Sequence, residues 1–187
     1  MKKILYTAVL AAVSVFAACG AQEEARPRLP VSDKAGDMPN YVIEGFVLES
    51  TESGRIVWSV NASAAQVFEL KGKAYAQNVE IEMSGGESGG IFLKGNKAVI
   101  YMENNFMEIE GDVYGVSDDG AVLRTEKLYW DDKERRIFTD EKVTIIKDGA
   151  KLEGAGFESD PGMRNFEINK NVEMIAERIK EKEKEGE

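Results

Sequence analysis

Histidine is absent from this chain of 187 residues, and that absence bears first on catalysis. Without histidine the chain lacks the commonest general base, the commonest metal ligand and every Ser-His triad. Carboxylates do cluster at Asp131, Asp132 and Glu134, but they lie in a charged stretch, residues 130–136, between two expected strands. A solvated turn explains such a stretch more simply than a pair of catalytic acids does. The sequence therefore predicts neither an enzyme nor a metal or cofactor site.

Cysteine is almost as scarce, because Cys19 is the only one. Lys2 and Lys3 precede an apolar stretch, residues 4–18, that is too short to span a bilayer and is typical of a signal peptide. Its end, Phe16-Ala17-Ala18-Cys19, resembles the lipobox of bacterial lipoproteins, in which this cysteine becomes the lipidated first residue of the mature protein. The alternative is an ordinary signal peptide with an incidental cysteine. With one cysteine no disulfide can form within the chain, so the apolar core must stabilise the fold alone.

Basic residues are outnumbered by acidic ones, with 24 basic and 34 acidic residues. Removal of residues 1–18 would delete two lysines and no acidic residue. Nucleic acid is therefore excluded as a partner, since phosphate backbones are bound by basic surfaces. The same charge disfavours any ligand held chiefly by its phosphates, and we expect a ligand to be bound through apolar groups.

Proline is rare, and three of the four prolines fall within residues 20–40, at Pro27, Pro30 and Pro39. This composition predicts an extended tether over residues 19–40, between the lipidated cysteine and a single β domain over residues 41–174. The remaining residues, 175–187, are rich in Glu and Lys and are expected to form a short helix or a disordered tail. A glycine-rich run over residues 84–90 is expected to be a loop within the domain.

The β domain contains one apolar pattern written four times. Val79, Val113, Val143 and Val172 are each preceded, at a nearly constant distance, by four residues with identical spacing. These sets are Val60, Ala62, Ala65, Val67; Leu93, Gly95, Ala98, Ile100; Leu123, Thr125, Leu128, Trp130; and Leu152, Gly154, Phe157, Ser159. Units of about 30 residues that cannot bury their own apolar face must stack on their neighbours, which predicts an elongated molecule with two ends.

Each unit has the features of a two-stranded antiparallel hairpin. Apolar and polar residues alternate around Ile137 to Ile145, and Asp-Gly pairs at 119–120 and 148–149 are typical of tight turns. In each first strand the apolar register changes parity, as between Thr125 and Leu128, and such a change requires a bulge or a corner. The predicted fold is therefore all-β: a folded-over antiparallel sheet, resembling a jelly roll, built from about four two-strand repeats.

A family resemblance rests on these segments taken together. The stretches 109–113, 119–131, 137–143 and 148–157, with Trp58 to Ala62 before them, resemble the LptC family of periplasmic lipopolysaccharide export proteins. The resemblance covers residues 41–174 and implies a folded β sheet whose apolar interior takes the acyl chains of lipopolysaccharide. It also implies transfer from the inner-membrane ABC permease complex to an LptA-like bridge protein. The residues that match groove positions are Trp58, Val60, Val67, Leu93, Ile100, Val113, Leu123, Leu128, Trp130, Val143 and Phe157, and the alternative is that they pack a dry core.

The two ends of the stack are the expected partner sites. Edge strands expose unpaired backbone groups that pair with a strand of another chain. The N-terminal edge, with Tyr41 and Ile43, would meet the permease, and the C-terminal edge, with Phe166, Ile168 and Val172, would meet the LptA-like protein.

The sequence departs from familiar LptC proteins in its anchor. Those proteins hold to the inner membrane through a transmembrane helix, whereas this chain offers Cys19. Gly20 is not the aspartate that favours inner-membrane retention in some bacteria, so the outer membrane stays open as an alternative location. A second function also stays open: a scaffolding lipoprotein that assembles through its sheet edges and carries no lipid.

Overall fold

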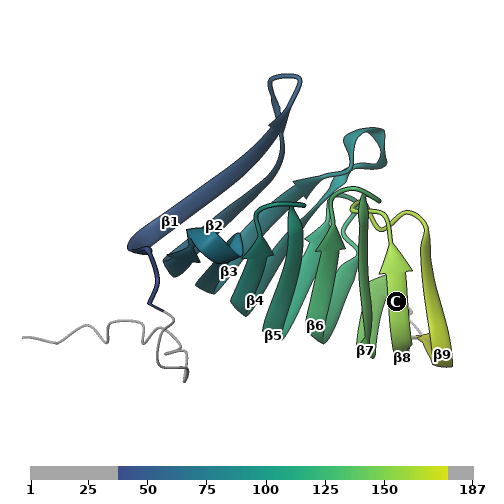
Figure 1. Ribbon diagram of the computed structural model, residues 1–187. Helices are drawn as coiled ribbons and strands as arrows, with labels where there is room; N and C mark the ends of the chain where they lie inside the picture. Colours follow the sequence, from purple (N-terminus) through teal and green to yellow (C-terminus); the bar gives the residue numbers. More distant parts are fainter. Residues whose placement is uncertain (1–37, 177–187) are drawn as a thin grey trace, which may run out of the picture.

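A single antiparallel sheet of nine strands makes up the computed structural model, which describes residues 38–176 (Figure 1). The strands follow one another in chain order, and each pairs with the next. Signal peptide, Cys19, most of the expected tether and the tail beyond residue 176 lie outside the described residues. The elements are β1 (Tyr41–Glu52), β2 (Arg55–Phe68), the 3-10 turn η1 (Glu69–Lys71), β3 (Lys73–Ser84), η2 (Gly86–Ser88), β4 (Gly90–Tyr101), β5 (Phe106–Ser117), β6 (Val122–Asp131), β7 (Arg136–Lys147), β8 (Ala150–Ser159) and β9 (Phe166–Ala176).

The four predicted repeats correspond to the hairpins β2–β3, β4–β5, β6–β7 and β8–β9, with β1 added at the front. The all-β prediction is therefore confirmed. Asp148 and Gly149 join β7 to β8 with φ values of 50° and 75°, as a tight hairpin turn requires. The glycine-rich run forms η2 and its flanks, between the first and second repeats. The strand β9 continues to Ala176, two residues past the expected end of the domain.

The strands bend near their middles, and in the first strand of each repeat, β2, β4, β6 and β8, the apolar pattern changes parity there. Leu123 and Thr125 are buried on one side of the change in β6, and Leu128 and Trp130 on the other. The ladder registers shift at this point between β4 and β5, β5 and β6, β6 and β7, β7 and β8, and β8 and β9. Several strands place a left-handed residue directly before the repeat valine: Asn78 (φ 49°), Asp112 (φ 48°) and Asn171 (φ 52°). A left-handed residue turns the strand, and Asn and Asp are found at these positions because short polar side chains tolerate this conformation best.

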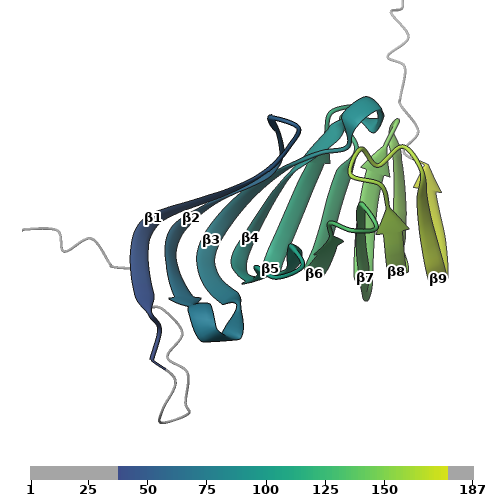
Figure 2. The ribbon, with the colours of Figure 1, turned by 45° about the horizontal axis from the view of Figure 1, so that its top comes forward.

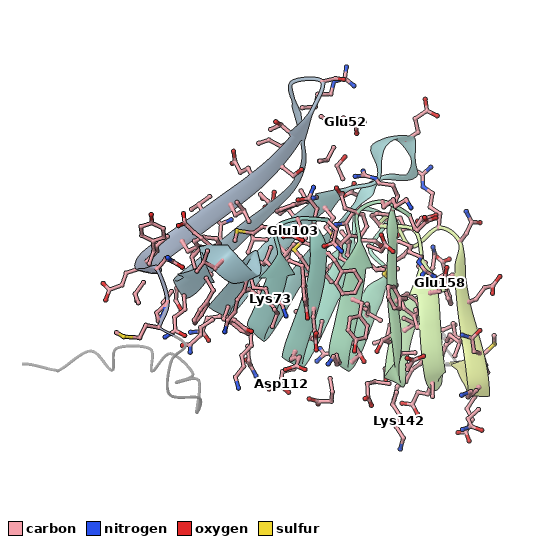
Figure 3. The ribbon with its side chains drawn as sticks, in the orientation of Figure 1. Glu52, Lys73, Glu103, Asp112, Lys142 and Glu158 are labelled. Carbon is pink, nitrogen blue, oxygen red and sulfur yellow. The ribbon has the colours of Figure 1, made fainter. Side chains whose placement is uncertain are left out.

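The aligned bends form a crease across the sheet. Figure 3 shows Asp112 of β5 and Lys142 of β7, which both precede a repeat valine, along the same lower margin of the molecule. On either side of the crease, residues paired from strand to strand form an apolar row through all nine strands. One row is Tyr41, Val67, Ala74, Ile100, Met107, Trp130, Ile137, Ser159 and Phe166. The other is Leu48, Val60, Ile81, Leu93, Gly115, Leu123, Ile145, Leu152 and Met174. We call the two parts of the sheet the Trp130 half and the Leu123 half.

The two halves fold toward each other, as one hydrogen bond demonstrates. Arg135 lies just beyond the Trp130 row, at the free margin of the Trp130 half, and the strand pairings place this margin beside the first residue of β3. Ser84 is the last residue of β3 and lies at the opposite margin, in the Leu123 half. In a flat sheet the length of β3 alone would separate them by about 35 Å. The Nη2 atom of Arg135 nevertheless donates a hydrogen bond of 2.6 Å to the carbonyl oxygen of Ser84. The sheet is therefore doubled over (Figure 2). The apolar rows line the interior between the halves.

Candidate functional site

All eleven residues matched to groove positions lie in the interior of the folded sheet. Each is buried, with exposed fractions from 0% for Val60 and Leu123 to 9% for Val67. All belong to one continuous hydrophobic cluster. The structure therefore brings together every predicted groove residue: Trp58, Val60, Val67, Leu93, Ile100, Val113, Leu123, Leu128, Trp130, Val143 and Phe157.

The interior carries no charge among residues 38–176. Its buried polar side chains are neutral, and most have backbone partners within the fold. The hydroxyl of Thr125 donates to the carbonyl oxygen of Lys142 at 2.9 Å, and the hydroxyl of Ser159 donates to that of Asn165 at 3.0 Å. The interior is thus an apolar environment that suits hydrocarbon and not ions.

The interior is closed in its middle and partly exposed at both ends. Residues of the two rows are fully buried in β4 to β7, but at the first strand Tyr41 is 53% exposed and Ile43 37% exposed. At the last strand, Met174, which faces the interior opposite Leu152, is 69% exposed. One end of each row is thus exposed to water, at Tyr41 in β1 and at Met174 in β9.

The partner residues predicted at the ends lie in the two edge strands. Tyr41 and Ile43 belong to β1, and Phe166, Ile168 and Val172 belong to β9. Phe166 and Ile168 pack against the core, whereas Val172 is 53% exposed. Their positions on the edges agree with the sequence, while their roles in binding partners stay predictions.

The gap between the free margins of the two halves, which we call the mouth, is crossed by two contacts. One is the hydrogen bond from Arg135 to Ser84. In the other, Nζ of Lys147, at the end of β7 in the Leu123 half, donates at 2.8 Å to the carbonyl oxygen of Met163. Met163 belongs to the loop over residues 160–165 between β8 and β9, has φ of 53° and is fully buried in the core. Figure 2 shows this loop arching over the C-terminal strands.

The turn containing Arg135 is exposed at Lys133 and Glu134, as a solvated loop should be, and it also supplies one of the contacts across the mouth. Arg135 also pairs with Asp132 at 3.2 Å and lies 5.5 Å above the ring of Trp130. Sequence reasoning missed Arg135, Lys147 and Met163, because their partners are fixed by the fold and not by any nearby motif.

The two tryptophans carry the unsatisfied donors of the interior. The indole Nε1 atoms of Trp58 and Trp130 are buried, and neither has a hydrogen-bond partner among the described residues. Both side chains lie near the mouth, Trp130 beneath Arg135 and Trp58 at a pocket that Ser84 also lines. A buried N–H without a partner is costly, so an acceptor oxygen brought in by a ligand would be stabilised there.

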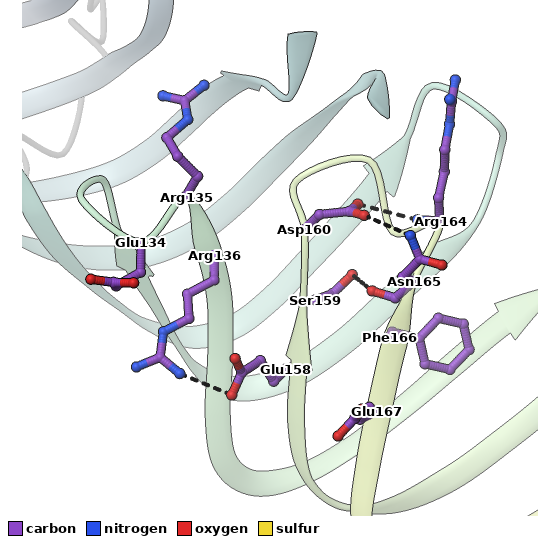
Figure 4. Close-up of a pocket in the computed structure, with 10 residues that line it drawn as sticks. All are labelled: Glu134, Arg135, Arg136, Glu158, Ser159, Asp160, Arg164, Asn165, Phe166 and Glu167. Atoms are coloured by element: carbon purple, nitrogen blue, oxygen red, sulfur yellow. Dashed lines mark hydrogen bonds and ion pairs between the residues drawn. The ribbon is translucent and has the colours of Figure 1, made fainter. Parts of the chain in front are cut away.

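A polar pocket lies at the free margin of the Trp130 half, between the β6–β7 turn and the β8–β9 loop (Figure 4). Arg136 pairs with Glu158 at 2.9 Å across it, and the Asp160 carboxylate accepts a hydrogen bond from the backbone N–H of Arg164. The Arg136 guanidinium and the Glu158 carboxylate are thus occupied with each other. No nucleophile is paired with a general base in this pocket, so it offers no catalytic arrangement.

The ionisable groups whose pKa values are shifted lie on the outer surface of the sheet and at the margin of the mouth. Lys127 lies between Glu108 and Glu110, and its hydrogen bonds to both carboxylates raise its pKa, while the bond to Lys127 lowers the pKa of Glu110. At the β5–β6 turn, the Ser117 hydroxyl and then the Lys147 ammonium lower the pKa of Asp119 to about 2. These groups stabilise turns and strand pairs and do not reach the interior.

Two further features are absent from the part of the chain that the structure describes. Residues 38–176 include no group of three or more acidic or cysteine side chains placed to hold a metal ion. Within the same range, no helix has the length and apolar character needed to cross a bilayer.

Comparison with known proteins agrees with this architecture. A crystal structure of LptH from Pseudomonas aeruginosa, described as the LptA-homologous periplasmic component of the lipopolysaccharide transport device, is similar in fold. The TM-score is 0.50 and the identity 16%, over 63% of this chain and 93% of LptH. No curated protein matches the sequence. The fold thus defines a doubled-over β sheet of the LptA-like class.

The sequence itself identifies the family. Residues 6–177 match the family described as lipopolysaccharide-assembly, LptC-related, and the chain belongs to that family. The resemblance found in the sequence is confirmed, as is the prediction that the chain is not an enzyme, because these proteins are transport components. The chain takes part in lipopolysaccharide transport in the periplasm.

Proposed function

We propose that this protein holds the acyl chains of lipopolysaccharide in the interior of its folded sheet and passes the lipid from the inner-membrane ABC permease complex to an LptA-like bridge protein. The observation that carries the proposal is the pair of apolar rows. They run through all nine strands, are buried in the middle, and each has one exposed end, Tyr41 of β1 in one row and Met174 of β9 in the other. A closed core would bury its ends as well, whereas a segment of a longer conduit leaves them for its neighbours to cover.

The energetics favour such an interior. Burying one methylene group stabilises a lipid by about 0.8 kcal/mol, so an acyl chain of about a dozen carbons would lose on the order of 10 kcal/mol in water. The charge-free interior removes that cost, while the polar headgroup stays in solvent at the mouth. An acidic protein can therefore bind an acidic lipid.

In this proposal the two edges bind different partners, which would set the direction of transfer. The β1 edge, with Tyr41, Ile43 and the outward-facing Val42 and Val47 exposed, would receive a strand of the permease. The β9 edge, with Val172 and Met174 exposed, would receive the LptA-like protein. The lipidated Cys19 would hold the domain at the membrane, with the inner membrane favoured by the permease partner and the outer membrane as the alternative.

Site-specific photocrosslinking tests the proposal. Ile43 faces the interior opposite Ala65, whereas its neighbour Val42 pairs with Gln66 on the outer face. Met174 and Glu173 form the same contrast in β9. A benzoylphenylalanine at position 43 or 174 should crosslink to lipopolysaccharide in cells, and the same group at position 42 or 173 should not.

The alternative, a scaffold without lipid, predicts a different pattern. Crosslinks from positions 43 and 174 would then reach protein partners only, with no lipopolysaccharide adduct. Equal lipid labelling from both faces would also contradict the proposal, because it would indicate adsorption to the surface.

A further inference from the structure

The mouth poses a steric problem for a lipid held in this interior. The proposed function places acyl chains inside and a large polar headgroup outside, so the headgroup must pass along the mouth. Two contacts stand across that route, from Arg135 to Ser84 and from Lys147 to Met163. A lipid that moves through the sheet must open each contact it passes.

The Arg135 contact is the easier of the two to open. Ser84 is exposed, so water can solvate its carbonyl oxygen once the hydrogen bond breaks. The Lys147 contact ends on fully buried Met163, and Lys147 is also held by Asp119 at 2.9 Å. Breaking that contact would disturb the core, whereas releasing Arg135 moves only an exposed turn.

Arg135 is also placed to bind the group that displaces Ser84. Its present acceptor there is a neutral carbonyl oxygen, and a guanidinium bonds more strongly to an anionic oxygen, often through two parallel N–H groups. Directly beneath it lies Trp130, whose buried Nε1 has no partner within residues 38–176. The cation and the apolar interior therefore meet at one point of the mouth, as an amphiphile with a charged headgroup requires.

We propose that Arg135 is a gate and a headgroup-binding residue: it exchanges the carbonyl oxygen of Ser84 for an anionic headgroup oxygen, such as a phosphate, and so opens the mouth for the attached chains. This inference rests on the proposed function. It adds a polar recognition site to an interior that otherwise recognises only hydrocarbon. Asp132, already paired with Arg135, holds the guanidinium at the rim during the exchange.

Binding of lipid A with intact phosphates and of enzymatically dephosphorylated lipid A to the purified full chain tests the gate. The native chain should bind the phosphorylated form more tightly, and Arg135→Gln should reduce that preference roughly tenfold, the order expected for one charge-assisted hydrogen bond. Dephosphorylated lipid A should associate with Arg135→Gln at least as fast as with the native chain, because the contact across the mouth is gone. Arg135→Lys should keep part of the preference.

Arg136→Gln is the matched control. Because Arg136 points outward to Glu158, its substitution should leave the preference for phosphorylated lipid A unchanged. An unchanged preference in a folded Arg135→Gln chain would overturn the inference and leave the proposed function standing. A native chain that binds neither form would overturn both. Competition by millimolar inorganic phosphate that abolishes the preference would show a site for free phosphate and would also overturn the lipid gate.

Discussion

Leu123 and Leu128 lie five residues apart on the same strand, yet both side chains face the interior and both are fully buried. Successive side chains of a straight strand alternate between faces, so an odd separation should place these two on opposite faces. The bend in β6 between them reverses the alternation. The same five-residue separation joins buried residues in β2 (Val60 and Ala65) and in β4 (Leu93 and Ala98), and these bends turn one sheet into a two-sided enclosure.

Truncation of either leucine should destabilise the domain. We expect Leu128→Ala to lower the free energy of unfolding by about 2–5 kcal/mol, the range measured for buried leucines that leave a cavity. Lys133→Ala, in the exposed turn that follows, should change it by no more than about 0.5 kcal/mol. Urea denaturation of the two variants checks this prediction, and similar midpoints would indicate that the interior is already loosely packed.

The crease should depend on residues that tolerate the left-handed conformation. Asp112 has φ of 48°, so Asp112→Val should lower stability by about 1–2 kcal/mol, whereas Asp112→Gly should be close to neutral. Thermal denaturation distinguishes the two variants. Equal losses would show that the Asp112 side chain, which accepts a hydrogen bond from Asn96, matters more than the backbone conformation.

The β5–β6 turn should lose stability in acid. Folding lowers the pKa of Asp119 from its usual 3.8 to about 2, so the ionised carboxylate stabilises the fold above pH 3.8. As the pH falls from about 4 to about 2, this contribution is lost. The difference in Tm between the native chain and Asp119→Asn should therefore shrink across that interval. A constant difference from pH 5 to pH 2 would contradict the assigned cause.

A charge introduced at the C-terminal edge should weaken partner binding without lowering the stability of the domain. Met174 is 69% exposed, so Met174→Asp should leave the Tm nearly unchanged but weaken binding to an LptA-like partner in a pull-down, because a charge would be buried at the joint. Glu173→Gln, its outward-facing neighbour, should have no comparable effect. Full binding by Met174→Asp would argue against transfer at β9.

The bent sheet could be predicted from the sequence, but the contacts that cross the mouth could not. The odd spacing between apolar residues within one strand, as from Ala62 to Ala65 or from Leu123 to Leu128, marks each bend locally. The repeats, the bends and the edge strands could therefore all be inferred. The contact between Arg135 and Ser84 joins residues 51 positions apart and depends on where the bends place two turns. Met163 lies in a loop outside the repeat pattern, so its burial required the folded structure.

The central claim, that acyl chains occupy the interior, is tested most directly by the chain's own fluorescence. Trp58 and Trp130 are the only tryptophans and are 2% and 0% exposed. A lipid A analogue with brominated acyl chains should quench the emission of both indoles on binding, since bromine quenches only near contact, while a water-soluble quencher should have little effect. Binding of the brominated lipid without quenching of either indole would show that the interior is a dry core and that lipid is held elsewhere.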